Sequence, residues 1–405
     1  MQSKQINLQR VIFIALVFSL VILYVLSWVD VVSDLAQLTG SDFMAFYAAG
    51  RSMFEHAPAA AYDLASLKAS EESVLGFRIA DQDVNPFVHP PLILPVIWLV
   101  ARFNYLTAFY LWALFILILC MLNAQIAINL FSSTNGLNRI VLWAGTFLFF
   151  PLFISLVNGQ DSALLLLGAM LWYYGFTQNS NHMAGLGLAL TTIRPQIALL
   201  LAIPMIFNAH SRKVWWWFCI GSAVLVVFSI AILGQDGVRN FINILSVSAS
   251  GEGYKINEAA MVNLIGMVKR LNLSFDAATI RTVGWVGSLA GLIILCLVWG
   301  KAPAIIDKHV SLAVIVAMFA SPHLHYHDLA LLIIPILILI RGLITAEKVS
   351  LEYAALIPFG VSLVLVFTYS IEPLNYLIIY LIELGLLIFA WLLNKQANLK
   401  APVGS

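Results

Sequence analysis

Apolar segments long enough to cross a bilayer recur along the whole sequence. A helix needs about 20 apolar residues to span hydrocarbon, and about 12 such segments can be drawn. None of them alternates apolar with polar residues as the strands of a membrane barrel do. Because 61% of the residues are hydrophobic and 10% are charged, the sequence predicts an all-α polytopic membrane protein that forms one domain over residues 1–405. The expected segments are 11–29, 87–102, 106–130, 140–157, 161–177, 184–207, 214–234, 283–300, 309–322, 329–341, 351–369 and 375–393.

Lysines and arginines indicate the orientation of the chain. If the chain starts on the inner side and alternates, the short outer connections hold only Arg139, an asymmetry that the positive-inside rule favours. Segment 11–29 is longer than the apolar core of a signal peptide and predicts an uncleaved anchor. Two long loops, 30–86 and 235–282, are then expected on the outer side. The expected inner cations are Lys4, Arg10, Arg102, Arg212, Lys213, Lys301, Lys308, Arg341, Lys348, Lys395 and Lys400.

Several functional classes leave no trace in the sequence. It contains no P-loop, no GxGxxG turn, no GxSxG elbow and no HExxH helix, which argues against ATP, dinucleotides, and the common protease and lipase chemistries. The net charge of +1 gives no reason to expect a nucleic-acid partner. The cysteines, Cys120, Cys219 and Cys296, all lie in apolar segments and indicate no disulfide framework. We therefore expect no cofactor.

Acidic residues collect in the first expected outer loop, 30–86, where nine of the 20 acids of the chain lie. Aromatic residues between Phe43 and Phe54 recur at helical spacing, and leucines and valines between Leu64 and Leu75 do so less cleanly. This pattern predicts two amphipathic helices that lie on the outer leaflet. For most of the acids, the ordinary role is a solvated face of this folded loop.

Asp42 differs from the other acids in its position. It lies between the first apolar segment and the aromatic stretch that starts at Phe43, close to the expected lipid boundary. Aspartate is a favoured helix N-cap, but a carboxylate at the mouth of a membrane bundle also suits chemistry at the membrane surface. The sequence leaves capping and catalysis equally open.

Polar residues also interrupt the apolar segments further along the chain. His89 is followed by Pro90 and Pro91, which would hold it rigidly at the start of the second segment. Arg194 lies near the middle of the expected segment 184–207 and is followed by a helix-breaking proline. An arginine at that depth costs about 2.5–3.5 kcal/mol on insertion scales and needs an anion. A structural ion pair with a buried acid and a bound phosphate are both possible partners.

Three histidines crowd the connection between two apolar segments, in the run His323-Leu324-His325-Tyr326-His327-Asp328. Alternating histidines share a face on a strand but point apart on a helix, and no cysteine lies nearby. We therefore expect no metal here. Hydrogen bonding to a phosphate or a sugar is favoured over a zinc site, and a purely structural cap stays open.

A set of short motifs stands in a fixed order along the chain: Asp42-Phe43, Tyr47-Ala48-Ala49-Gly50, Ala61-Tyr62-Asp63, His89-Pro90-Pro91-Leu92, Asn158-Gly159-Gln160, Arg194-Pro195-Gln196 and Ser321-Pro322 with His327. Taken together, these motifs resemble glycosyltransferase family 87, the polyprenyl-phosphate-mannose-dependent α-mannosyltransferases of the GT-C superfamily. The resemblance runs from about residue 11 to residue 335. Two positions depart from the pattern: Asp42 lacks the second acid of the DxD-like loops of some GT-C relatives, and His89 stands where related sequences often have tyrosine.

The resemblance implies an inverting transfer of a hexose, with mannose expected, from a polyprenyl-phosphate sugar to a lipid or glycan acceptor. It implies Asp42 as the base, because the phosphate of the donor leaves without needing a proton from a second carboxylate. The site would lie on the outer side of the inner (plasma) membrane, and Asn158–Gln160 reaches it only if a nearby segment is short or re-entrant. The expected substrate-binding residues are Arg194, His327, His89, Gln196, Gln160, Asn158, Tyr47 and Asp328.

A secondary transporter and a lipid flippase are the rival interpretations. A transporter would also have about 12 helices and a buried arginine, but it usually consists of two related halves. The sequence shows no internal repeat, and neither rival explains the long first loop.

Overall fold

The computed structural model describes residues 8–131, 136–250, 258–271, 275–302 and 307–400, and throughout these ranges the regular structure is helical, with no strand. The helices named below are α1 (Leu8–Ser33), α2 (Leu35–Thr39), α3 (Phe43–Glu55), α4 (Leu64–Leu75), α5 (Leu94–Val100), α6 (Tyr105–Asn129), α7 (Leu137–Phe147), α8 (Phe150–Asn158), α9 (Ser162–Thr177), α10 (Asn181–Leu190), α11 (Pro195–Ala202), α12 (Arg212–Ser250), α13 (Leu264–Arg270), α14 (Ala277–Gly300), α15 (Asp307–Ala320), α16 (Ile333–Thr345), α17 (Leu351–Ala354), α18 (Ile357–Tyr369) and α19 (Glu372–Lys400).

In the described part of the chain, 7 helices are long and apolar enough to cross a membrane, or up to 8 if the bent pair α7–α8 counts as one span. The expected number of about 12 spans is therefore not confirmed. Prolines account for part of the difference, because they shorten helices that the apolar composition alone would extend. The expected segment 87–102, for instance, contains only a 3-10 turn and the seven-residue α5.

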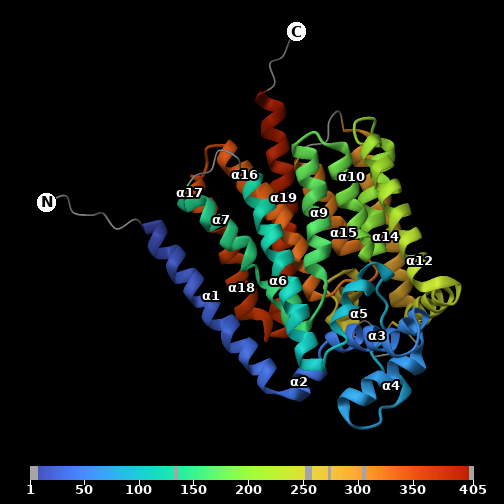
Figure 1. The fold of residues 1–405 in the computed structure, drawn as a ribbon. Helices are drawn as coiled ribbons and strands as arrows, with labels where there is room; N and C mark the ends of the chain where they lie inside the picture. The colour runs from blue at the N-terminus through green and yellow to red at the C-terminus, as the bar shows by residue number, and fades with distance from the viewer. Residues whose placement is uncertain (1–7, 132–135, 251–257, 272–274, 303–306, 401–405) are drawn as a thin grey trace.

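The helices form a bundle with one elaborated end (Figure 1). The short helices α2, α3 and α4 lie together there, and we call this the capped end. The span that contains α16 is the most buried of the candidate spans, whereas α1 is the least buried and lies at the edge of the bundle. The polar segments of the long first loop are thus placed at one end of a largely apolar core.

Helix α3 packs closely against other elements at the capped end. Helices form at both expected places, 43–55 and 64–75, and nine of the 13 residues of α3 are buried, so other parts of the protein cover most of this helix. At Gly50 an added Cβ would lie 2.6 Å from the carbonyl oxygen of Ile97 in α5. Glycine at this position allows the two helices to approach closely.

The two long loops meet at the capped end. Asn240 Nδ2 donates to the Ala59 carbonyl oxygen at 3.2 Å, and the rings of Tyr62 and Phe241 lie 5.0 Å apart. Helix α12 bends at Gly234, whose φ of 67° favours glycine. Segment 235–250 and the first loop are therefore on the same side of the bundle.

The expected segment 184–207 is not one span. Its ends lie opposite the capped end, where Asn208 Nδ2 donates to the Ala302 carbonyl oxygen at 2.7 Å and Tyr173 donates to Asp307 Oδ1 at 3.1 Å. The helix breaks at Arg194 (φ −123°, ψ 81°), which directly precedes Pro195. Proline disfavours helical φ and ψ angles at the residue before it, so the chain leaves the helical conformation at Arg194. Helix α10 therefore runs toward the capped end, and α11 runs back from it.

Arg139 and Arg102 each lie at the end of the bundle opposite to the one that the sequence predicted. Arg139 follows Asn138, which accepts a 2.7 Å hydrogen bond from Gln9 at the start of α1, so it lies away from the capped end. Arg102 precedes Phe103, whose carbonyl oxygen accepts a 3.0 Å hydrogen bond from Tyr47 in α3, so it lies at the capped end. The reason is that α5 is too short to cross the membrane.

Candidate active site

Asp42 starts α3 without capping it. Its side chain makes no hydrogen bond to the first turn of the helix, and it is exposed. Its Oδ2 accepts a hydrogen bond from Gln160 Nε2 at 2.8 Å. Asp63, by comparison, caps α4 by accepting from the backbone nitrogen of Ser66 at 2.9 Å. Of these two acids, only Asp42 has a carboxylate that does not accept a hydrogen bond from the backbone of the helix that follows it.

Gln160 links Asp42 to a buried arginine. Its Oε1 accepts from Arg194 Nη2 at 3.4 Å. The preceding residue, Gly159, ends α8 with a φ of 68°, and an added Cβ there would lie 2.4 Å from the Cβ of Phe43. Only glycine fits so close to the start of α3 with that backbone. This turn brings Gln160 to Asp42, as the resemblance required.

Arg194 is the centre of a buried ionic cluster. Its Nη2 lies 3.0 Å from Asp161 Oδ1, and its Nε lies 3.6 Å from Asp328 Oδ1. Its Nη1 lies 2.8 Å from His89 Nδ1. Every nitrogen of the guanidinium thus faces a protein group, so an incoming phosphate would have to displace one of them. The ion-pair interpretation of Arg194 describes this arrangement better than the phosphate interpretation.

Asp161 is fully buried between Arg194 and His89. Besides Arg194, it meets His89 Nδ1, which lies 3.0 Å from Oδ2. Within the described structure neither oxygen accepts a well-directed hydrogen bond, so these contacts are mainly electrostatic. Burial alone would raise the pKa of Asp161, but the charges of Arg194 and His89 hold that pKa below its usual range.

His89 is held rigidly, as its two following prolines suggested. Its carbonyl oxygen accepts from the Tyr62 hydroxyl at 2.7 Å, and its ring lies 4.5 Å from that of Phe46. One ring nitrogen, Nδ1, faces both Arg194 and Asp161. That nitrogen can accept from Arg194 only when unprotonated and donate to Asp161 only when protonated. The Nδ1 atom of His89 therefore hydrogen-bonds with one of these two partners at a time, and its tautomer decides which.

The histidine run packs against the same cluster. The ring centroids of His323 and His325 are 4.7 Å apart, and those of His325 and His327 are 5.9 Å apart. Burial and the neighbouring His327 lower the pKa of His325 to about 4. The carboxylate of Asp42 is close enough to act electrostatically on the rings of His325 and His327. The described residues contain no group of three or more His, Cys, Asp or Glu side chains placed to hold a metal ion.

Of the remaining expected site residues, Gln196, Asn158 and Asp328 lie at or near this cluster, whereas Tyr47 lies at the turn between α5 and α6. Gln196 Nε2 donates to the His323 carbonyl oxygen at 3.2 Å and joins α11 to the histidine run. Asn158 is half-buried at the end of α8, two residues before Gln160. Asp328 Oδ2 lies 3.7 Å from His327 Nε2. Tyr47 instead faces the turn between α5 and α6, where its hydroxyl donates to Phe103.

Comparison with known proteins identifies the group to which this sequence is related. The family model described as glycosyltransferase family 87 matches residues 87–335, more than half of the chain. The chain belongs to glycosyltransferase family 87. No curated protein and no solved structure gave a match. Membership in family 87 makes the protein a membrane glycosyltransferase, which uses a sugar donor and an acceptor.

The match to family 87 includes the buried cluster but begins after Asp42. His89, Gln160, Arg194 and His327 all lie within residues 87–335. Asp42 is connected to this matched region by its hydrogen bond to Gln160. The geometry of the structure, rather than the family match, is what joins the exposed carboxylate to the other polar residues.

Sequence reasoning missed Asp161 and Ser162. Asp161 is the nearest acid to Arg194, and Ser162 Oγ donates to Asp328 Oδ1 at 2.7 Å. A signal for Asp161 was available, since a buried arginine needs an anionic partner and Asp161 directly follows Gln160. No comparable signal distinguishes Ser162 from other serines at helix starts.

Proposed function

We propose that this family-87 protein transfers a hexose, with mannose the first candidate, from a polyprenyl-phosphate sugar to a lipid or glycan acceptor, with inversion. The observation that carries the proposal is the state of Asp42. It is the exposed acid of the cluster, whereas Asp161 and Asp328 are buried and paired. An exposed carboxylate held by one amide is well placed to accept a proton from an acceptor hydroxyl.

In the proposed reaction the acceptor oxygen attacks the anomeric carbon while Asp42 takes the hydroxyl proton. The bond from the anomeric carbon to the phosphate oxygen breaks, and its electron pair leaves with the polyprenyl phosphate. A single displacement of this kind inverts the anomeric centre, and one carboxylate suffices because the phosphate leaves as an anion. Gln160 donates to Asp42 Oδ2 at 2.8 Å and so fixes the direction of the carboxylate.

The histidines are the proposed partners of the leaving phosphate. His89 and His327 border the cluster, and an imidazole N–H group can donate a hydrogen bond to a phosphate oxygen. Arg194 supports them indirectly, because it holds Asp161, Asp328 and Gln160 in place. Asn158, Gln160 and Gln196 are the proposed partners of sugar hydroxyl groups.

The decisive experiment is transfer by the purified full-length protein in liposomes. Radiolabelled polyprenyl-phosphate mannose should give labelled product with candidate lipid or glycan acceptors, and the product should have the anomeric configuration opposite to that of the donor. A nucleotide-activated mannose serves as the control donor and should give none. Transfer from the nucleotide sugar, or retention of configuration, would contradict the proposal.

We also propose that the capped end faces outward from the inner membrane. In a background without native cysteines, Gln82→Cys and Gln235→Cys place exposed thiols at the capped end, and Ser350→Cys places one at the opposite end. In intact cells an impermeant maleimide is expected to label the first two variants and not the third. Labelling of Ser350→Cys alone would reverse the orientation and move the proposed active site to the inner face.

A further inference from the structure

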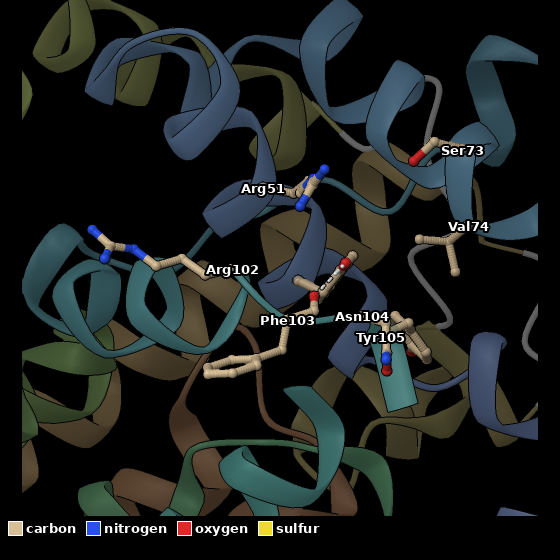
Figure 2. A pocket seen from close by; sticks show the side chains of 8 residues that line it. Arg51, Ser73, Val74, Arg102, Phe103, Asn104 and Tyr105 are labelled. Carbon is tan, nitrogen blue, oxygen red and sulfur yellow. Dashed lines mark hydrogen bonds between the residues drawn. The ribbon is translucent and has the colours of Figure 1, made fainter. Parts of the chain in front are cut away.

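A hollow lies at the capped end, and its lining includes no member of the ionic cluster around Arg194. It has a volume of about 410 Å³ and lies between α3, α4 and the turn from α5 to α6, with Arg51, Ser73, Arg102 and Asn104 among its lining residues. Figure 2 shows the Arg102 side chain extending outward at one edge, with Ser73 and Val74 at the opposite edge. Tyr47 also lines it and lies about 140° around α3 from Asp42. Of the residues assigned to the active site above, the hollow thus contains only Tyr47.

Arg102 carries a positive charge without an acidic partner in the described structure. Its guanidinium carbon lies 3.7 Å from the ring centre of Trp98 and 5.7 Å from that of Phe54. Lys68, a nearby cation at the capped end, pairs with Asp81 at 2.6 Å. Arg51 also pairs with an acid, Glu55. Arg102 is therefore the cation of this hollow that is available to an anionic ligand.

The hollow lies beside the start of a helix that has an exposed apolar face. Helix α6, a candidate membrane span, starts at Tyr105 on its wall. The helix then presents Leu106, Tyr110 and Leu114 at four-residue intervals, with 43%, 46% and 52% of each residue exposed. Residues four apart lie on one helical face. Phe103, at the rim, is 48% exposed. A charged hollow therefore adjoins a continuous apolar stripe.

We propose that this hollow binds the headgroup of an anionic, phosphate-bearing lipid whose chain lies along the apolar stripe of α6. A planar guanidinium suits a phosphate, and its stacking on Trp98 orients it. Asn104 caps α6 through Oδ1, which accepts from Thr107, and this leaves the amide NH₂ group of Asn104 as a donor. The N-terminus of α6 adds partial positive charge.

This ligand has two sources in a membrane: a bulk anionic phospholipid, or the polyprenyl phosphate carrier of the proposed donor. Both present the same chemistry to Arg102. The proposal concerns a site separate from Asp42, so its failure would leave the proposed transfer reaction untouched.

Native mass spectrometry of the purified full-length protein tests the proposal. Phosphatidylglycerol, phosphatidylcholine with the same chains, and polyprenyl phosphate are each titrated in detergent. Arg102→Gln removes one charged hydrogen-bonding partner of the phosphate. This variant is therefore expected to bind phosphatidylglycerol, polyprenyl phosphate or both about tenfold more weakly than the wild type. Phosphatidylcholine binding should change little. The matched control Arg239→Gln removes an exposed arginine outside the hollow and should bind as the wild type does.

A second variant guards against misfolding of Arg102→Gln. Asn104→Asp keeps the cap, since aspartate caps as well as asparagine, but places a negative charge in the hollow, and it should weaken the same lipid about tenfold. A loss restricted to polyprenyl phosphate identifies the carrier lipid, and a loss that includes phosphatidylglycerol identifies bulk lipid. Equal losses in Arg239→Gln, or unchanged binding in Asn104→Asp, would overturn the proposal.

Discussion

Asp42→Asn is expected to reduce hexose transfer by about 10²–10⁴-fold, the usual contribution of a positioned general base. Asparagine keeps the shape of the side chain and an oxygen that can accept from Gln160, but it cannot take a proton. Because Asp42 makes no capping hydrogen bond, the melting temperature should not fall. Donor binding should also stay near the wild-type value. Initial rates in the liposome assay, thermal unfolding and donor titration measure the three quantities separately.

Asp63→Asn is the matched control for this variant. Asp63 lies in the same loop, but it caps α4 through the backbone nitrogen of Ser66. Asparagine is an equally good cap, so this variant should keep both its stability and its turnover. If Asp42→Asn retained full turnover, or if it unfolded, the assignment of Asp42 as the base would be wrong.

Arg194→Ala is expected to have the largest effect on stability. It would leave Asp161, with 0% of its surface exposed, without its 3.0 Å partner. Asp328 and Gln160 would lose contacts as well. Removing one member of a buried ion pair typically costs about 3–5 kcal/mol in the free energy of unfolding. Thermal and denaturant unfolding of the purified protein in detergent should show this loss.

A second substitution separates the two interpretations of Arg194. If the cost comes from the unpaired charge on Asp161, Asp161→Asn should restore part of the stability in the Arg194→Ala background. Arg194→Lys should be intermediate, because lysine keeps the charge and loses the planar fork. A variant Arg194→Ala that kept its melting temperature but lost donor binding would instead make Arg194 a direct ligand of the donor phosphate.

The sequence predicts the class of this fold and several members of the cluster. Apolar composition alone indicates helices in a membrane, because hydrocarbon allows no unpaired backbone. His89, Gln160 and Arg194 stand out as polar residues in apolar surroundings, and the fold brings them together although they are far apart along the chain. Gln160 likewise bonds to Asp42 across 118 residues. Burying a polar group without a partner is costly, and this cost makes such residues recognisable from the sequence alone.

Other features depend on how helices end, which composition does not report. The segments 87–102 and 184–207 have the apolar character of spans, but proline and the residue before it break both. The error displaced Arg102 and Arg139 to the wrong ends. Tyr47 was predicted to bind substrate because of its motif, and its hydroxyl donates to the Phe103 carbonyl oxygen, away from the ionic cluster. Asp161 was missed because its partner Arg194 is distant in sequence.

The hairpin of α10 and α11 has a consequence for biogenesis. Its arms of 10 and 8 residues are about 15 Å and 12 Å long, so neither reaches across about 30 Å of hydrocarbon. At Gly185 an added Cβ would lie 2.5 Å from the carbonyl oxygen of Val214 in α12. Arg194, at the tip of the hairpin, pairs with Asp328, which is synthesised 134 residues after it. The buried ionic cluster is therefore complete only after the segment that carries Asp328 has been synthesised.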